Sequence, residues 1–143
     1  MTKRNDIINI ISNLRNSANS FIVEKLAEEG AAGLVLSHGA ILVALYENGP
    51  QPMNAVCLRV NRDKSTLTVL VRKLETLGYV KREPDKKDKR STILHLTEKG
   101  TAFRPIFERI SADLCQKIWG DTSENESEAI CKQLTEMTRR LKV

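Results

Sequence analysis

Side chains that can hydrogen-bond to phosphates and base edges recur along one face of a predicted helix, Lys64 to about Leu77. Ser65, Thr68, Val69 and Arg72 follow one another at helical spacing on that face. Hydroxyl and guanidinium groups bind phosphate oxygens, arginine also fits a guanine edge, and valine suits a thymine methyl group. Such a face could contact nucleic acid, on which Arg72 could read a guanine edge or hold a phosphate.

The start of this helix favours anions in its own right. Lys64, Ser65 and Thr66 occupy the first turn, where backbone N–H groups without a helical partner favour a phosphate. Asp63 is the predicted N-cap, with Asn61 as the alternative. We expect the three first-turn residues to hold the helix against a nucleic-acid backbone.

The opposite face of the helix is apolar and must pack on a core. Its residues recur at spacings of three and four, as in a buried helical stripe: Leu67, Leu70, Val71, Leu74 and Leu77. Gly78 stands where the helix is expected to end. A shorter predicted helix, Met53 to Val60, precedes it across a tight turn, with Val56 and Val60 facing inward. The two together have the pattern of a helix-turn-helix.

A charged hairpin follows. Two short strands are predicted, residues 79–83 and 91–96, with the polar turn PDKKDKR between them. In this turn Lys86, Lys87 and Lys89 provide diffuse attraction to phosphates. From Arg59 to Arg90 there are 11 Lys and Arg against 5 Asp and Glu, a charge of +6 in a chain of net +5. The basic charge is therefore concentrated on this block, as in a nucleic-acid footprint.

Two segments of this block resemble the multiple antibiotic resistance regulator (MarR) family of winged helix-turn-helix transcription regulators. DKSTLTVLVRKLETLGYVKR resembles that family's recognition helix and first wing strand, and DKRSTILHLTEKG matches its pattern D-x-R-x(5)-L-T-x-x-G. The family's layout also fits the whole chain. The resemblance implies a mainly α fold with a small β-hairpin wing (α+β), in which dimerisation helices flank a winged helix-turn-helix.

The resemblance further implies roles for two wing residues and a histidine. Arg90 resembles the family's wing arginine, which enters the minor groove, and Asp88 resembles the acid that pairs with it and orients it. Small aromatic or phenolic effectors bind, in the family, between the dimer helices and the DNA-binding lobe. We expect His38 at the rim of that space. We therefore expect a homodimer that binds a pseudo-palindromic site in double-stranded DNA, usually as a repressor.

The segments outside the block are long and amphipathic. We predict one domain over 1–143, with a winged helix-turn-helix core at about 35–100 and dimerisation helices at about 5–29 and 101–142. Apolar residues recur there at spacings of four and three, as in heptads: Ile7, Ile11, Leu14, Ala18 and Phe21; Phe103, Phe107, Ile110, Leu114 and Ile118; Ile130, Leu134, Met137 and Leu141. Three such seams exceed what one small domain buries, which predicts a homodimer; packing within a single chain is the alternative.

Capping residues predict where the remaining helices begin. Ser37 is expected to cap a nearly apolar core helix, HGAILVALYEN. Thr97 is expected to cap a long helix that reaches about Trp119 and bends at Pro105. Ser123 or Thr122 is expected to cap the last helix.

Several protein classes are disfavoured. No segment approaches the roughly 18 apolar residues of a membrane span, and the N-terminal residues lack the features of a signal peptide. A cytoplasmic protein without a membrane partner is therefore expected. The chain has two histidines and no HExxH motif, phosphate loop or Ser-His-Asp order. We accordingly expect no enzyme, no cofactor and no metal site.

The three cysteines leave a second hypothesis open. Cys57 is interpreted as a small packing residue where the two helices cross. Cys115 or Cys131 could instead make the chain a thiol-based redox-sensing regulator. A winged-helix module that binds protein is a further alternative, against which the basic wing and the polar helix face argue.

Overall fold

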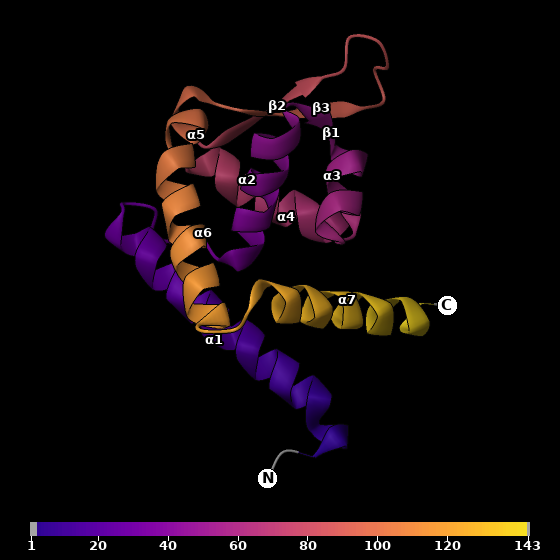
Figure 1. Cartoon of the computed structure of the whole chain (residues 1–143). Coiled ribbons are helices and arrows are strands. Elements are labelled where there is room, and N and C mark those ends of the chain that lie inside the picture. Colours follow the sequence, from indigo (N-terminus) through magenta and orange to yellow (C-terminus); the bar gives the residue numbers. More distant parts are fainter. Residues whose placement is uncertain (1–2, 143) are drawn as a thin grey trace. The chain divides into compact units, whose positions relative to one another are not determined.

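The computed structural model describes residues 3–142 and confirms a mainly α chain with one small antiparallel sheet (Figure 1). The chain divides into two compact units, residues 3–111 and 112–142. The elements in chain order are η1 (Arg4–Asp6), α1 (Ile7–Glu28), α2 (Leu36–Asn48), β1 (Gln51–Pro52), α3 (Met53–Val60), α4 (Lys64–Thr76), β2 (Val80–Pro84), β3 (Thr92–Leu96), α5 (Glu98–Ala102), α6 (Arg104–Trp119) and α7 (Glu124–Leu141).

Helix α2 lies at the centre of the core of the first unit. Its residues Ile41, Leu42 and Leu45 are at most 1% exposed. Helices α3 and α4 pack against it with side chains that are fully buried, namely Val56, Leu67, Val71 and Leu74. The three α4 residues belong to the apolar stripe predicted for the second helix of the helix-turn-helix, and their burial fixes which face of α4 is turned outward.

The start of α2 differs from the prediction. The expected Ser37 cap is wrong: the N-cap is Val35, and Ser37 is the second helical residue. Two other side chains satisfy the first backbone N–H groups. The Nδ1 atom of His38 accepts a hydrogen bond from the Val35 N–H at 2.9 Å, and Oδ1 of Asn19, on α1, accepts one from the Leu36 N–H at 3.0 Å. The His38 imidazole and the Asn19 amide thus accept the hydrogen bonds that were expected to go to the Ser37 hydroxyl.

The turn between α3 and α4 follows from two side chains. Asn61 ends α3 in the left-handed conformation, with φ of 55°, which asparagine tolerates better than most residues. Asp63, rather than Asn61, is the N-cap of α4, and its carboxylate accepts a hydrogen bond from the Thr66 N–H at 2.7 Å. The predicted bounds of α4 are confirmed to within one residue.

The sheet has three strands in the order β1-β3-β2, one more than the predicted hairpin. The hairpin pairs Val80 with Leu96 and Pro84 with Thr92. The additional strand is Gln51–Pro52, which pairs with Leu94 and Ile93 on β3. It joins the start of α3 to the base of the wing, and the loop between β2 and β3 projects beyond the helices (Figure 1).

The long helix predicted from Thr97 is in fact two helices. Thr97 is confirmed as the cap, because its Oγ1 accepts a hydrogen bond from the Gly100 N–H at 3.0 Å. Helix α5 then ends at Ala102, and α6 begins at Arg104 with Pro105 as its second residue. Proline has no N–H to continue the earlier helix, and it is well tolerated in a first turn. The predicted bend is therefore a break.

The second unit consists of the last part of α6 and of α7. Ser123, not Thr122, caps α7 by accepting a hydrogen bond from the Glu126 N–H at 3.2 Å. None of the α7 side chains that the structure describes is buried. Across the described residues, no helix is both long and apolar enough to span a membrane.

Candidate nucleic-acid interface

Helix α4 presents a polar face to solvent while its other face holds it on the core. On this outer face Ser65 and Arg72 are exposed, Val69 is 66% exposed and Thr68 is half-buried. The Thr68 hydroxyl donates a hydrogen bond to the Lys64 carbonyl at 2.8 Å, which leaves its oxygen as an acceptor. An acceptor at this position matches a base amino group, whereas the guanidinium of Arg72 offers only donors.

Asp63 organises the first turn of α4. Its carboxylate accepts from the Thr66 N–H and from the Ser65 hydroxyl, the latter at 2.9 Å. These bonds, the Thr66 backbone bond first, hold the pKa of Asp63 below its ordinary value, so the carboxylate stays charged. Ser65 and Thr66, the two predicted phosphate donors, therefore already donate hydrogen bonds to Asp63. Lys64 is an exposed cation at this end of the helix.

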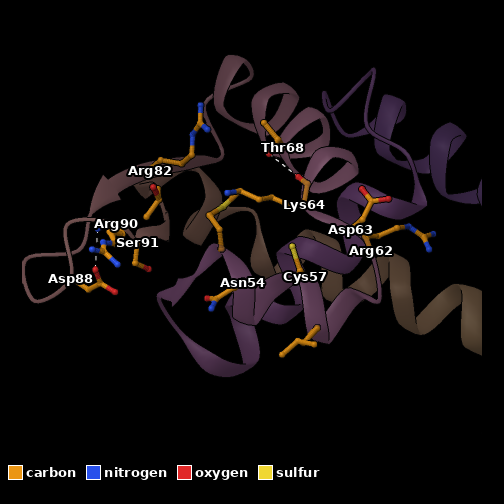
Figure 2. Close-up of a pocket in the computed structure, with 13 residues that line it drawn as sticks. Asn54, Cys57, Arg62, Asp63, Lys64, Thr68, Arg82, Asp88, Arg90 and Ser91 are labelled. Atoms are coloured by element: carbon orange, nitrogen blue, oxygen red, sulfur yellow. Dashed lines mark hydrogen bonds between the residues drawn. The ribbon is translucent and has the colours of Figure 1, made fainter. Parts of the chain in front are cut away.

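A groove of about 670 Å³ lies between α3, the start of α4 and the wing (Figure 2). Its lining includes the apolar side chains of Met53 and Leu58, with the Cys57 thiol between them in the sequence. Four cationic residues line it as well: Arg62, Lys64, Arg82 and Arg90. Arg90 and Asp88 lie together at its wing end, and Arg62 and Asp63 lie at the opposite end (Figure 2). Such a groove matches the negative charge and the apolar sugars of a nucleic-acid strand.

The acids of the wing shape its turn through the backbone. Asp88 Oδ1 accepts a hydrogen bond from the Arg90 N–H at 3.0 Å, and Asp85 Oδ1 accepts one from the Lys87 N–H at 2.9 Å. The hydrogen bond expected between Asp88 and the Arg90 guanidinium is therefore replaced, in this structure, by one to the Arg90 backbone. The predicted phosphate-attracting residues Lys86, Lys87 and Lys89 are all exposed on this turn.

Sequence reasoning missed two of the groove's arginines. Arg82 lies on β2 and its Nε donates to Glu75 Oε1 of α4 at 2.9 Å, so it connects the hairpin to α4 while lining the groove. Arg62 follows the left-handed Asn61 in the turn between α3 and α4. Both residues lie in the basic segment from Arg59 to Arg90, but only the tertiary structure brings them into the same groove.

His38 lies away from the groove and is buried, with 6% of its surface exposed. Burial first, and then the nearby Lys73 ammonium, hold the pKa of His38 below 6.5. The imidazole is therefore neutral at pH 7, as its hydrogen bond from the Val35 N–H requires. Its expected place at the rim of an effector site stays a prediction.

The three cysteines have different surroundings. Cys57 is half-buried in the groove, whereas Cys115 on α6 and Cys131 on α7 are exposed. All three are free thiols. Among the described residues, no group of three or more His, Cys, Asp and Glu is placed to hold a metal ion.

Comparison with protein families and curated sequences identifies the block that contains the groove. The model of a winged helix DNA-binding domain matches residues 34–100. The HTH-type transcriptional regulator SarZ of Staphylococcus haemolyticus is 32% identical over 101 residues, which cover 69% of this chain and 67% of SarZ. The uncharacterized HTH-type transcriptional regulator YkoM of Bacillus subtilis is 33% identical over 91 residues, 64% of this chain and 59% of YkoM.

Solved structures extend the similarity to nearly the whole chain. A MarR transcriptional regulator from Methanosarcina mazei superposes with a TM-score of 0.80 and 25% identity, covering 96% of each chain. The regulator AbfR, in its overoxidized form bound to DNA, gives a TM-score of 0.78 and 27% identity over 96% of this chain and 93% of its own. Reduced AbfR bound to DNA is also similar, with a TM-score of 0.77.

Proposed function

This chain belongs to the MarR family of winged helix-turn-helix transcription regulators, and we propose that it is a homodimeric repressor of a pseudo-palindromic operator, released by a small-molecule effector. Helix α4 enters the major groove, where Thr68, Val69 and Arg72 meet base edges. The wing reaches the flanking minor groove through Arg90, and Lys64, Lys86, Lys87 and Lys89 meet phosphates together with the first turn at Ser65 and Thr66.

One observation supports this proposal most strongly. The groove between the helix-turn-helix and the wing is lined by four cationic residues, and the exposed polar face of α4 begins in it with Lys64 and Thr68. A DNA strand that passes between a major-groove helix and a minor-groove wing must cross such a gap, with its phosphates beside the cations. This basic lining argues against a module that binds protein.

The proposed dimer is supported by apolar side chains that the single chain leaves exposed. In α1 they include Ile8 at 63% and Leu14 at 52%, and in residues 112–142 they include Ile130 at 42% and Leu134 at 37%. Burying such large aliphatic side chains against a second copy stabilises the assembly by about 25 cal/mol per Å² of apolar surface. A two-fold dimer then presents its recognition helices about 34 Å apart, one turn of DNA.

The binding proposal is tested by titrating fluorescent duplexes at several salt concentrations. We expect affinity to fall steeply with salt, and a duplex from the promoter beside the gene to bind more tightly than a scrambled duplex of equal length. Equal affinity for both duplexes would contradict sequence-specific regulation. Release by an effector is checked by adding phenolic and small aromatic acids to the preformed complex.

Redox control is a second candidate, which the similarity to AbfR favours, because that regulator is known in reduced and overoxidized forms. Cys115 and Cys131 are exposed thiols, as an oxidant-sensitive site requires. The Cys115→Ser/Cys131→Ser double variant tests it, with the peroxide response of DNA binding as the measurement. If the thiols are only structural, peroxide leaves the wild-type chain and the variant equally bound; release of the wild type alone establishes the sensor.

A further inference from the structure

The C-terminal end of the recognition helix is closed by Gly78. Its N–H donates to the Glu75 carbonyl and the N–H of Tyr79 donates to the Leu74 carbonyl, both at 2.9 Å. Gly78 has a φ of +88°, the left-handed conformation that this pair of bonds requires. The pattern satisfies carbonyls inside the last turn, and it leaves those of Leu77 and Gly78 to find partners outside the helix.

Those partners come from the segment that opens α5. The Lys99 ammonium donates to the Leu77 carbonyl at 2.6 Å, and the Thr97 hydroxyl donates to the Gly78 carbonyl. The Thr97 N–H also donates to the Tyr79 carbonyl at 3.0 Å. Three hydrogen bonds therefore join residues 97–100, the end of the L-T-x-x-G pattern, to the C-terminal end of α4 and the turn after it.

Two further contacts, both with Tyr79, bring the start of α5 close to the turn that follows α4. A Cβ on Gly100 would lie 2.1 Å from the Tyr79 carbonyl oxygen, so the backbones of α5 and of the α4–β2 turn pack without room for a side chain. The Lys99 ammonium also lies over the Tyr79 ring, 4.6 Å from its centroid. The Gly100 carbonyl accepts a hydrogen bond from the buried Tyr46 hydroxyl at 2.9 Å, which links α5 to α2.

Lys99 makes one of these three hydrogen bonds, and it does so from outside the outer face of α4. It belongs to α5, it does not line the groove, and its ammonium is bound at the end of α4 opposite to Lys64 and Ser65. A cation at a helix C-terminus interacts favourably with the helix dipole as well as with the carbonyl. Any effect of Lys99 on base reading must therefore act through the position of α4.

We propose that Lys99 is a positioning residue for DNA recognition, which holds α4 at the angle at which Thr68, Val69 and Arg72 meet base edges together. The proposal rests on the proposed function of α4 as recognition helix. Without the Lys99 bond, the end of α4 is held by Thr97 and by core packing, and the helix shifts more freely across the major groove. Specific contacts, which need all three side chains in register, weaken more than phosphate contacts, which tolerate small displacements.

The test compares Lys99→Met, which keeps the length of the side chain and removes its donor, with Lys99→Arg, which keeps a donor and a cation. Lys132→Met, on exposed α7, removes the same charge elsewhere and is the control. Each full-length variant is titrated against a duplex selected by the wild-type chain from a random pool and against a scrambled duplex, over a range of salt. Amide hydrogen exchange of Gly78 and Tyr79 is measured in the absence of DNA.

We expect Lys99→Met to lose affinity for the selected duplex by about 3- to 10-fold, with its affinity for the scrambled duplex and its salt slope unchanged. Exchange of the two amides should accelerate, and Lys99→Arg should restore most of both properties. An unchanged ratio of the two affinities overturns the proposal. So does an equal loss on both duplexes with a smaller salt slope, which would make Lys99 a phosphate ligand.

These measurements distinguish a failure of the proposed function from a failure of the positioning role of Lys99. If the wild-type chain selects no preferred duplex, the proposed function is wrong and the role of Lys99 in recognition falls with it. In that case the amide exchange still shows whether Lys99 holds the end of α4, since that measurement needs no DNA. If the wild type is selective and Lys99→Met is equally selective, only the positioning role is wrong.

Discussion

Arg90 ends the wing turn with its backbone held by Asp88. The Asp88 carboxylate accepts from the Arg90 N–H, and the Asp88 carbonyl accepts from the Ser91 N–H, both at 3.0 Å. The guanidinium is thereby presented at the wing end of the groove, where a narrow A·T-rich minor groove would attract it. The Asp88 carboxylate therefore holds the backbone of the turn, and we propose that this turn orients the Arg90 side chain.

This arrangement predicts a graded series of wing variants. Arg90→Ala should weaken operator binding roughly tenfold, about 1.4 kcal/mol, and leave thermal stability nearly unchanged. Arg90→Lys should recover only part of the affinity, since lysine lacks the planar fork. Fluorescence anisotropy with an operator duplex and thermal unfolding are the two measurements.

Asp88 variants distinguish the turn from an ion pair. Asp88→Asn keeps an oxygen that can accept from the Arg90 N–H and loses the charge, so we expect nearly wild-type binding. Asp88→Ala loses the acceptor and should bind more weakly. If Asn and Ala are equally harmful, the charge rather than the turn is what matters; if Arg90→Ala binds as well as wild type at physiological salt, the minor-groove role is wrong.

Arg72 has two possible roles that leave different signatures. As a base reader, Arg72→Ala should cost about 1–3 kcal/mol and relax specificity at one position in each half-site. As a phosphate ligand, it should weaken all sequences evenly and reduce the salt slope by about one. Selection from randomised duplexes with both proteins decides between the roles.

For single residues, the sequence predicted which side chains lie on the outer face of α4 but not which hydrogen bonds each one makes. The helical period placed Ser65, Thr68, Val69 and Arg72 together, because the buried stripe leaves α4 one outward face. Asp88 stands two residues before Arg90, a spacing that suits both a backbone turn and a side-chain pair. Only the conformation of the turn decides between these two partners.

Among the elements, the start of α2 makes a pH-dependent contribution to stability. His38 accepts from the Val35 N–H through Nδ1, and it can do so only when that nitrogen is unprotonated. Its pKa is lowered by burial and by Lys73, so the unfolded chain takes up the proton at a higher pH than the folded one. The contribution is therefore complete above pH 6.5 and is lost as pH falls from 6.5 toward the folded-state pKa.

Urea unfolding at about pH 7.5 and about pH 5.5 checks this prediction, because the ordinary pKa of histidine lies between these two pH values. The wild-type chain should lose free energy of unfolding at the lower pH. His38→Gln, which keeps an acceptor but takes up no proton, should lose less. His95→Gln removes the other histidine, whose Nε2 lies 3.4 Å from Glu83 Oε2, and measures the separate contribution of that residue. Identical pH dependence in all three proteins would contradict the assignment.

The elements that sequence predicted well are those with local signals. The Asp63 and Thr97 caps, the Gly78 stop and the period of α4 are all encoded within a few residues. Strand β1 escaped prediction because it is two residues long, contains a proline and exists only through pairing with β3. The cap of α2 was missed because Asn19 reaches it from α1, across 17 positions of the chain.

For the whole molecule, the central expectation is the dimer. Leu134 is 37% exposed on α7, so Leu134→Glu should leave the fold of the single chain intact. In a dimer that buries this residue, the charge should weaken self-association by at least about tenfold and operator binding with it, since a buried unpaired carboxylate is costly. Thr135→Glu introduces the same charge on a face of α7 away from this seam and should behave as wild type. Sedimentation velocity is the measurement, and a wild-type chain that sediments at 16.1 kDa at micromolar concentration would refute the dimer.

The DNA that the chain selects tests the proposed two-fold regulator most directly. Wild-type protein is incubated with a random duplex pool, the bound duplexes are sequenced, and the number of chains on the enriched duplex is determined from the mass of the complex. We predict an inverted repeat whose half-sites are centred about 10 bp apart, occupied by two chains. An enriched site without a repeat, one chain per duplex, or no enrichment at all would contradict a two-fold regulator that reads DNA with α4 and its wing.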